Sequence, residues 1–242
     1  MRPTSSIPLL LATLGGLLPG CTGAAQSTSD PVQSMINRLT PEEEAAGWRL
    51  LFNGQDLDGW RVFHGDAPTG WAAVDGELRR VGQGGDLITT EQYANFELAL
   101  EWKLGPGGNS GILLRVDEAS ERSYHSGPEM QVLDDEAHRD GLSRLTAAGS
   151  NYALHPAPEG VVRPVGEWNQ VRIVYDGAHV QHWLNGRKIV EYELWTPEWE
   201  ALVQGSKFAE WPEYGRATRG HIGLQDHGDA VAYRNIKLLE LP

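Results

Sequence analysis

The 242-residue sequence predicts an all-β protein, a β-sandwich with jelly-roll strand order and only minor short helices. Apolar residues recur at every second position in many short runs, which is the period of a half-buried strand. Gly, Asp, Asn and Pro separate these runs, and three dipeptides signal tight hairpins, namely Asp75-Gly76, Asp176-Gly177 and Asn185-Gly186. No heptad, fixed-period repeat or glycine-rich phosphate loop occurs, so many strands with little helix favour a sandwich.

The predicted elements follow from this punctuation. Thr40 is a helix cap, Pro41 suits the first helical position and Glu43 completes a capping box, so a short helix should begin there and end by Gly47. A second short helix should begin after Thr196. The predicted strands cover residues 48–52, 71–74, 77–81, 87–89, 95–104, 109–116, 129–133, 168–175, 179–184, 188–194, 221–225 and 231–241. Residues 117–167 are mostly loop, and a loop of this length is usually functional or disordered.

The N-terminus has the features of an export signal. Arg2 precedes an apolar stretch at residues 7–18 that is too short to span a bilayer, which predicts a signal peptide over residues 1–20. The sequence Leu18-Pro19-Gly20-Cys21 resembles a bacterial lipobox, and Cys21 is the only cysteine, so we expect it to be lipidated. A plain signal peptide cut nearby is the alternative. Residues 21–46 then form a lipidated tether with the short helix, and residues 47–242 form a single sandwich domain at the cell envelope, in the periplasm or on the cell surface.

Composition excludes several classes of partner and site. The formal net charge of −13 argues against nucleic acid and against anionic membrane surfaces, which leaves the lipid anchor as the expected membrane contact. A single cysteine excludes an intrachain disulfide and a metal–thiolate cluster. No H-E-x-x-H zinc pattern occurs, so no metal site is predicted, and a metal held by histidine and carboxylate from separate loops stays open as the alternative. No G-x-S-x-G nucleophile elbow occurs, which argues against serine hydrolase chemistry, and no cofactor is predicted.

Polar side chains from four predicted strands fall opposite the apolar faces of those strands. The set comprises Glu101 and Lys103 on the first strand, Arg115 on the second, Glu129 and Gln131 on the third, and Gln225 and His227 on the fourth. Side chains alternate across a strand, so these groups could share one face of the sheet. Gly111 lies on the same face, where a missing side chain lets a ligand approach the backbone. The alternative is a solvated outer face, which antiparallel sheets commonly have.

Glu129 is the strongest candidate for proton transfer and His227 the second. Partial burial of Glu129 would raise its pKa, whereas a nearby Arg115 would lower it, and the sequence leaves both directions open. His182 shares a predicted face with Ile173 and Leu184, which indicates a core histidine.

Several motifs resemble the 3-keto-disaccharide hydrolase domain family over residues 47–242. The matching segments are Asn109-Ser110-Gly111-Ile112, Gly127-Pro128-Glu129-Met130-Gln131-Val132-Leu133-Asp134, Gly166-Glu167-Trp168-Asn169, His182-Trp183-Leu184-Asn185-Gly186, Gly220-His221-Ile222-Gly223-Leu224-Gln225-Asp226-His227-Gly228 and Tyr233-Arg234-Asn235-Ile236. The resemblance implies a concanavalin A-like jelly roll in an exported bacterial protein. It also implies cleavage of oxidised disaccharides or glucosides that carry a ketone at C3.

Such chemistry starts with removal of the acidified C2 proton and continues with elimination of the C1 substituent and hydration. Under this resemblance the expected catalytic residues are Glu129 and His227, and the expected substrate-binding residues are Glu101, Asn109, Arg115, Gln131 and Gln225. A two-carboxylate glycosidase mechanism with Glu101 as the second acid stays open. The competing functions are a carbohydrate-binding surface lipoprotein, for which Trp183 is a candidate platform, and a purely structural lipoprotein.

Overall fold

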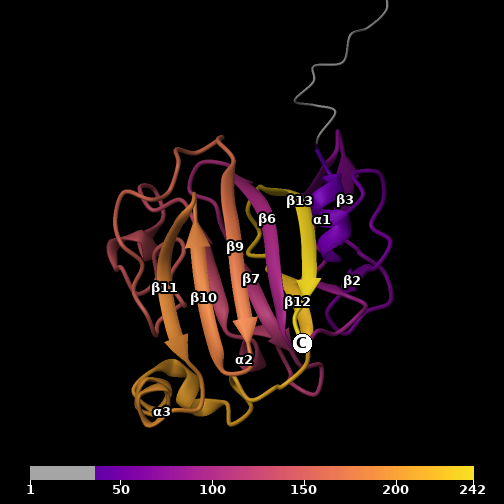
Figure 1. The fold of residues 1–242 in the computed structure, drawn as a ribbon. Coiled ribbons are helices and arrows are strands. Elements are labelled where there is room, and N and C mark those ends of the chain that lie inside the picture. The colour runs from indigo at the N-terminus through magenta and orange to yellow at the C-terminus, as the bar shows by residue number, and fades with distance from the viewer. Residues whose placement is uncertain (1–35) are drawn as a thin grey trace, which may run out of the picture. The chain divides into compact units, whose positions relative to one another are not determined.

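The computed structural model describes residues 36–242, in which two antiparallel sheets pack face to face as a jelly-roll sandwich (Figure 1). The eight-stranded sheet runs in the order β11 (Arg187–Glu193), β10 (His179–Leu184), β9 (Asn169–Asp176), β6 (Phe96–Leu104), β13 (Val231–Glu240), β4 (Glu77–Arg80) and β3 (Trp71–Val74), with β1 (Arg49–Leu50) also paired to β13. The five-stranded sheet runs in the order β2 (Trp60–Val62), β5 (Leu87–Thr89), β12 (His221–Leu224), β7 (Asn109–Val116) and β8 (Glu129–Leu133). The predicted fold class is confirmed. The predicted signal peptide and Cys21 lie outside the described residues.

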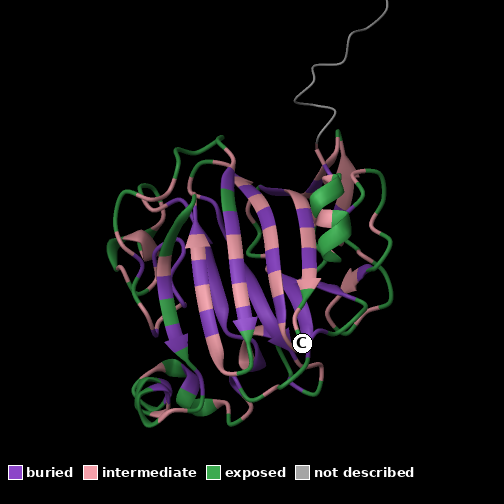
Figure 2. Ribbon diagram, in the orientation of Figure 1, coloured by how far each residue is buried: buried purple, intermediate pink, exposed green. Residues whose placement is uncertain are grey.

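The core lies between the two sheets and follows the predicted alternation. Along β6 every second residue is buried, from Phe96 through Trp102 to Leu104. Figure 2 shows the same stripes of buried and half-buried residues along β9 and β10. His182 on β10 is fully buried, as predicted for a core histidine, and burial lowers its pKa to about 4 because the charged imidazolium is poorly solvated there.

The five-stranded sheet differs from the larger one because it is covered on both faces. Every residue of β7, β8 and β12 is buried, whereas β6 in the larger sheet alternates between buried and half-buried residues. One face of the smaller sheet packs against the larger sheet. Loops must therefore cover the other face, and this covered face is where a cavity can be enclosed.

Helices are short, as expected. α1 (Pro41–Ala46) has the predicted capping box between Thr40 and Glu43 and ends at Gly47 in the left-handed conformation. The remaining helices are α2 (Ser123–Ser126), η2 (Arg139–Leu142), α3 (Pro197–Gln204) and η3 (Lys207–Glu210). Over the described part of the chain, no helix has the length and apolar character needed to cross a membrane.

Candidate active site

A cavity of about 610 Å³ lies over the loop-covered face of the five-stranded sheet. Its floor comes from β7, β8 and the segment that follows β12, and these supply Asn109, Glu129, Gln131, Gln225, Asp226 and His227. Loops, α2 and the two 3₁₀ helices build the walls, with Phe63, His64, Asp86, Arg122, Tyr124, Asp140, Tyr152 and Lys207 among the lining residues. A cavity of this size with several converging polar groups is typical of a small-molecule site.

Glu129 is the most enclosed ionisable group at the floor. Glu129 is only 6% exposed. Among the described residues, no hydrogen bond contributes to the pKa shift of its carboxyl group. The side chain lies across Gly111 of β7, where an added Cβ would come within 2.1 Å of Glu129 Oε1. Gly111 is therefore required at this position because the Glu129 carboxylate occupies the space above its backbone.

Burial raises the pKa of Glu129 to about 8, because the ionised carboxylate loses solvation in the cavity floor. The charge of Lys207 opposes this shift, and the negative charges of Asp86 and Asp140 add to it. Arg115, which the sequence suggested as the opposing cation, makes no contribution. A carboxyl group with a pKa near 8 exchanges protons readily around neutral pH, as a general acid or base requires.

Two neighbouring carboxylates that line the cavity have opposite electrostatic environments. Asp86 accepts hydrogen bonds from the Ser123 hydroxyl and from the amide of Asp226 at 2.8 Å, but burial raises its pKa. Burial also acts to raise the pKa of Asp226, yet the ion pair with Arg80 and two backbone amides outweigh it, so that pKa is lowered. Asp226 therefore keeps its negative charge, whereas Asp86 takes up a proton more readily.

Lys207, Asp140 and Tyr152 form another part of the wall. The Tyr152 hydroxyl lies 3.3 Å from Asp140 Oδ2, and Lys207 Nζ lies 4.4 Å from the centre of the Tyr152 ring. Burial together with the two nearby carboxylates, Asp140 and Glu129, raises the pKa of Tyr152 to about 12, so this hydroxyl stays protonated. Desolvation lowers the pKa of Lys207, while Glu129 and Asp140 act in the opposite direction.

Three amide side chains supply neutral hydrogen-bonding groups at the floor. Asn109 is buried, and its Oδ1 has no partner among the described residues. Gln131 is also buried, and its Oε1 accepts from the Val132 amide at 3.1 Å. The backbone amide of Gln225 donates to the Gly111 carbonyl at 2.9 Å, which ties this residue to the edge of β7. His227 is half exposed at the rim, with Nδ1 3.7 Å from Asp229 Oδ2.

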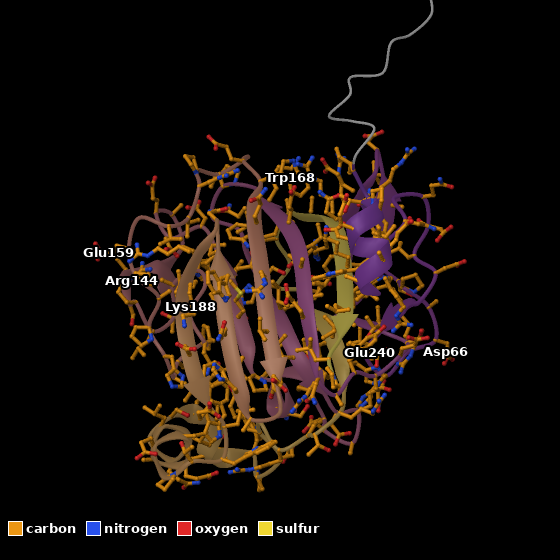
Figure 3. The ribbon with its side chains drawn as sticks, in the orientation of Figure 1. Asp66, Arg144, Glu159, Trp168, Lys188 and Glu240 are labelled. Carbon is orange, nitrogen blue, oxygen red and sulfur yellow. The ribbon has the colours of Figure 1, made fainter. Side chains whose placement is uncertain are left out.

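Glu101 does not share this site, so the prediction of a common face is wrong for this residue. The Gly105–Gly108 turn carries the chain from one sheet to the other, and β6 and β7 are therefore not neighbours. Glu101 lies on the outer face of the larger sheet, where it accepts a hydrogen bond from Arg234 Nε at 2.6 Å. Arg234 in turn lies 4.1 Å from the centre of the ring of Trp168, the residue just before β9 (Figure 3). Trp183 borders a separate hollow on this outer face.

Arg115 is also absent from the cavity, because a β-bulge reverses the alternation at the end of β7. Val116 pairs with His221 and Leu113 pairs with Gly223, so β7 has one residue more than β12, and Arg115 adopts a φ of 50°. The guanidinium consequently enters the space between the sheets, 3.8 Å from the centre of the Tyr175 ring. It donates to the carbonyls of Ala94 and Gly177 and to Asn95 Oδ1. Arg115 therefore has a structural role.

The cavity contains five of the seven site residues that were proposed from the sequence, namely Asn109, Glu129, Gln131, Gln225 and His227. Sequence reasoning missed the wall residues Asp86, Tyr124, Asp140, Tyr152 and Lys207, which come from loops and short helices without periodicity. The length of the 117–167 segment was the one available signal, because it marked a functional loop without identifying a residue. Within residues 36–242, no group of three or more His, Cys, Asp or Glu side chains is arranged to hold a metal ion.

Comparisons with known proteins agree with the resemblance found in the sequence. The chain is 33% identical to a 3-keto-disaccharide hydrolase of Bacteroides thetaiotaomicron over 280 aligned positions, which cover 96% of this chain and 97% of that protein. A crystal structure from Parabacteroides distasonis, of a protein provisionally named a glycosyl hydrolase, superposes with a TM-score of 0.81. The two sequences are 36% identical, and the superposition covers 86% of this chain and 100% of the Parabacteroides distasonis chain.

A second structure from Parabacteroides distasonis, with the same provisional name, has a TM-score of 0.62 at 30% identity. It covers 80% of this chain and 99% of its own. The family model of the 3-keto-alpha-glucoside-1,2-lyase-like domain matches residues 47–239, which is nearly the whole domain predicted from the sequence. This chain therefore belongs to the 3-keto-alpha-glucoside-1,2-lyase-like domain family.

Proposed function

We propose that this protein cleaves the glycosidic bond of 3-keto-glycosides, including 3-keto-disaccharides. The family and the Bacteroides thetaiotaomicron relative support a carbohydrate-acting, glycoside-cleaving hydrolase. The oxidised sugar as the substrate is the finer part of the proposal. The observation that supports it most is the buried carboxyl group of Glu129, which lies at the floor of a polar cavity with a pKa of about 8. A base of this kind suits removal of a weakly acidic C–H proton.

The reaction follows from the ketone. A carbonyl at C3 acidifies the proton on C2, and a base removes it to give an enolate with its charge on the C3 oxygen. The enolate then reforms the carbonyl while the C1–O bond breaks, so the leaving group departs as an alcohol after taking up one proton. Addition of water across the new C1–C2 double bond gives the free 3-keto sugar, which makes the net result a hydrolysis.

Five residues at the floor have a role in this scheme. Glu129 takes the C2 proton, and because C1 adjoins C2, the same carboxyl group can return the proton to the leaving oxygen. Gln131 and His227 donate hydrogen bonds to the ketone oxygen and stabilise the enolate. Asn109 and Gln225 bind sugar hydroxyls. Arg115 and Glu101 have no role here, since both lie outside the cavity.

The decisive experiment incubates the purified protein with a 3-keto-disaccharide and separately with the unoxidised disaccharide, and identifies the products by mass. We expect release of sugar from the oxidised substrate only. Cleavage of both at similar rates would instead favour a two-carboxylate glycosidase. Glu129→Gln should lower kcat by about 100-fold or more, because it removes the general base. Glu101→Gln is the matched control, since this carboxylate lies on the other sheet, and it should keep the native rate.

A Glu129→Gln protein that turned over at the native rate would remove the assignment of the base. An enone as the final product would show a lyase, with hydration left to solution or to another enzyme. Both outcomes are read from the same mass spectra.

We further propose that the protein is lipid-anchored at the bacterial cell envelope. The support is the sequence Leu18-Pro19-Gly20-Cys21 after an apolar stretch. Labelling of cells that express the full chain with a radioactive fatty acid should give a labelled membrane-bound protein, and Cys21→Ser should abolish both the label and the membrane association. An unlabelled, secreted wild-type protein would refute the anchor.

A further inference from the structure

The covered face of the five-stranded sheet is divided into a polar row and an apolar row. In the polar row, Gln131 pairs with Gly111, and the amide of Gln225 bonds to the Gly111 carbonyl. In the adjacent row, Glu129 pairs with Leu113, which lies beside Gly223 and Ile88. Glu129 thus belongs to the apolar row by register, but its carboxyl group leans over Gly111 into the polar row. The general base lies at the boundary between the two halves.

Two aromatic rings cover the apolar half. Ile88, Leu113 and Val116 are fully buried in a small cluster of their own, and Phe63 and Tyr124 pack against it. Both rings are only partly buried, and both line the cavity. The neighbours of each ring hold it in place from the side. Phe63 stacks on His64 with ring centres 4.0 Å apart, and the rings of Tyr124 and Trp211 meet edge to face with centres 5.7 Å apart.

We infer that Phe63 and Tyr124 form the binding subsite for the leaving group, and that this subsite selects glycosides whose leaving group is an aromatic ring. The inference rests on the proposed function. It follows from the connectivity of the sugar, in which C2 is bonded to both C1 and C3. When Glu129 is placed at C2, the ketone and the leaving group lie on opposite sides of it. The amide side chains of the polar row suit the ketone and the hydroxyls, so C1 and its substituent point toward the aromatic half.

An aromatic leaving group gains most from this surface. Flat rings stack or pack edge to face on Phe and Tyr with about 0.5–1.5 kcal/mol beyond simple burial, whereas a methyl group covers little of either ring. Ile88, Leu113 and Val116 pack against the two rings on the side of the sheet and so support them. Preorganised contacts of this kind favour binding, since little conformational freedom is lost.

The test compares a 3-keto phenyl glucoside with a 3-keto methyl glucoside. Phe63→Leu and Tyr124→Leu keep apolar cover over the small cluster but remove the flat ring. In each variant the ratio of kcat/KM for the phenyl substrate to that for the methyl substrate should fall about three- to tenfold, mainly through a higher KM. Tyr124→Phe keeps the ring and should keep the ratio. Trp183→Leu is the matched control, because this ring lies on the outer face of the other sheet.

Two results would overturn the inference. The ratio could stay at its wild-type value in both leucine variants, as it would if both substrates lost the same factor, or Trp183→Leu could lower the ratio as much as Tyr124→Leu does. If wild-type protein turns over no 3-keto substrate, the proposed function fails separately. The subsite is then tested by calorimetric titration with unoxidised phenyl and methyl glucosides. Tighter binding of the phenyl glucoside that Tyr124→Leu removes supports the subsite, and equal binding refutes it.

Discussion

Gly111→Ala is the substitution that tests most directly how the active site is built. Gly111 does not adopt a positive φ, so its backbone conformation accepts alanine. The added Cβ, however, would lie 2.1 Å from Oε1 and 2.7 Å from Cδ of Glu129, and contacts under 3.0 Å essentially never occur. The carboxyl group must therefore move by at least about 0.9 Å. It can move only toward the cavity, since the rest of the residue is buried.

The size of both effects follows from this displacement. A misplacement of about 1 Å in a reacting group can lower turnover about 100-fold, and we expect kcat to fall by this order. Overpacking of a buried site costs about 1–3 kcal/mol of unfolding free energy. The three atoms nearest to the added Cβ all belong to Glu129, so the stability cost should vanish in the Glu129→Ala background, where Gly111→Ala meets no carboxyl group. The coupling energy should therefore equal about the whole cost of the single substitution.

The assay is a double-mutant cycle of four proteins, with urea unfolding for stability and product release from a 3-keto-disaccharide for turnover. The Glu129→Ala protein and the double variant should unfold at the same urea concentration. If Gly111→Ala costs the same stability with and without the Glu129 side chain, or if the single variant keeps native turnover, the described contact does not control the base.

Three further predictions concern charge. Because burial raises the pKa of Glu129 to about 8 from an ordinary 4.5, the folded state retains a proton that the unfolded state releases. The unfolding free energy should therefore fall between about pH 5 and pH 8, and Glu129→Gln should remove this slope in urea titrations. Lys207→Met should move the acidic limb of the kcat/KM profile to higher pH, and Asp140→Asn should move it to lower pH, because the two charges shift the pKa of Glu129 in opposite directions. If both variants moved the acidic limb in the same direction, this prediction would be refuted. Arg115→Leu should cost about 3 kcal/mol of unfolding free energy by leaving buried carbonyl acceptors unpaired, with kcat/KM unchanged, and a loss of turnover at native stability would contradict it.

Much of the fold could be predicted because its signals are local. Asn185-Gly186 and Asp75-Gly76 form two-residue hairpin loops, and all four residues have positive φ values as such turns demand. In the third hairpin, Asp176 pairs with His179, so the loop is one position later than the dipeptide suggests. The shift of the loop moves the pairing between β9 and β10 by two residues, so His182 stays on the same face of the sheet. The conclusion that His182 is a core histidine is therefore unchanged.

The residues at the floor of the site could be predicted for the same reason. Two predicted site residues, Glu101 and Arg115, lie outside the cavity because their positions depend on contacts between distant parts of the chain. Period-two alternation places Glu129 and Gln131 on one face without any knowledge of the fold. Glu101 obeys the alternation too, but the sheet to which its strand belongs depends on pairing partners far along the chain. The prediction for Arg115 is wrong because β7 contains one extra residue relative to β12. At this bulge Gly220 passes so close to the backbone of Arg115 that a Cβ added to Gly220 would lie 2.4 Å from the Arg115 carbonyl carbon.

The walls could not be predicted, because their residues meet only after the loops pack. Asp86, Asp140 and Lys207 come from three separate segments, yet all three act on the pKa of Glu129. No spacing in the sequence links them. The electrostatics of the site therefore depend on tertiary contacts, although the identity of the central carboxyl group does not.

The raised pKa of Glu129 has a consequence for the order of events in the proposed reaction. A carboxyl group with a pKa of about 8 is ionised in only about one molecule in ten at pH 7. Removal of the C2 proton needs the ionised form, so the active fraction of free enzyme grows as the pH rises through about 8. Once the proton is taken, however, the same environment favours its retention, and the protonated group stands beside C1. Burial thus lowers the fraction of Glu129 that is ionised but makes the ionised carboxylate a stronger base. It also stabilises the protonated carboxyl group, which then donates its proton to the leaving oxygen. The positive charge of Lys207 limits this burial effect, which is why the Lys207 and Asp140 variants should move the rate profile in opposite directions.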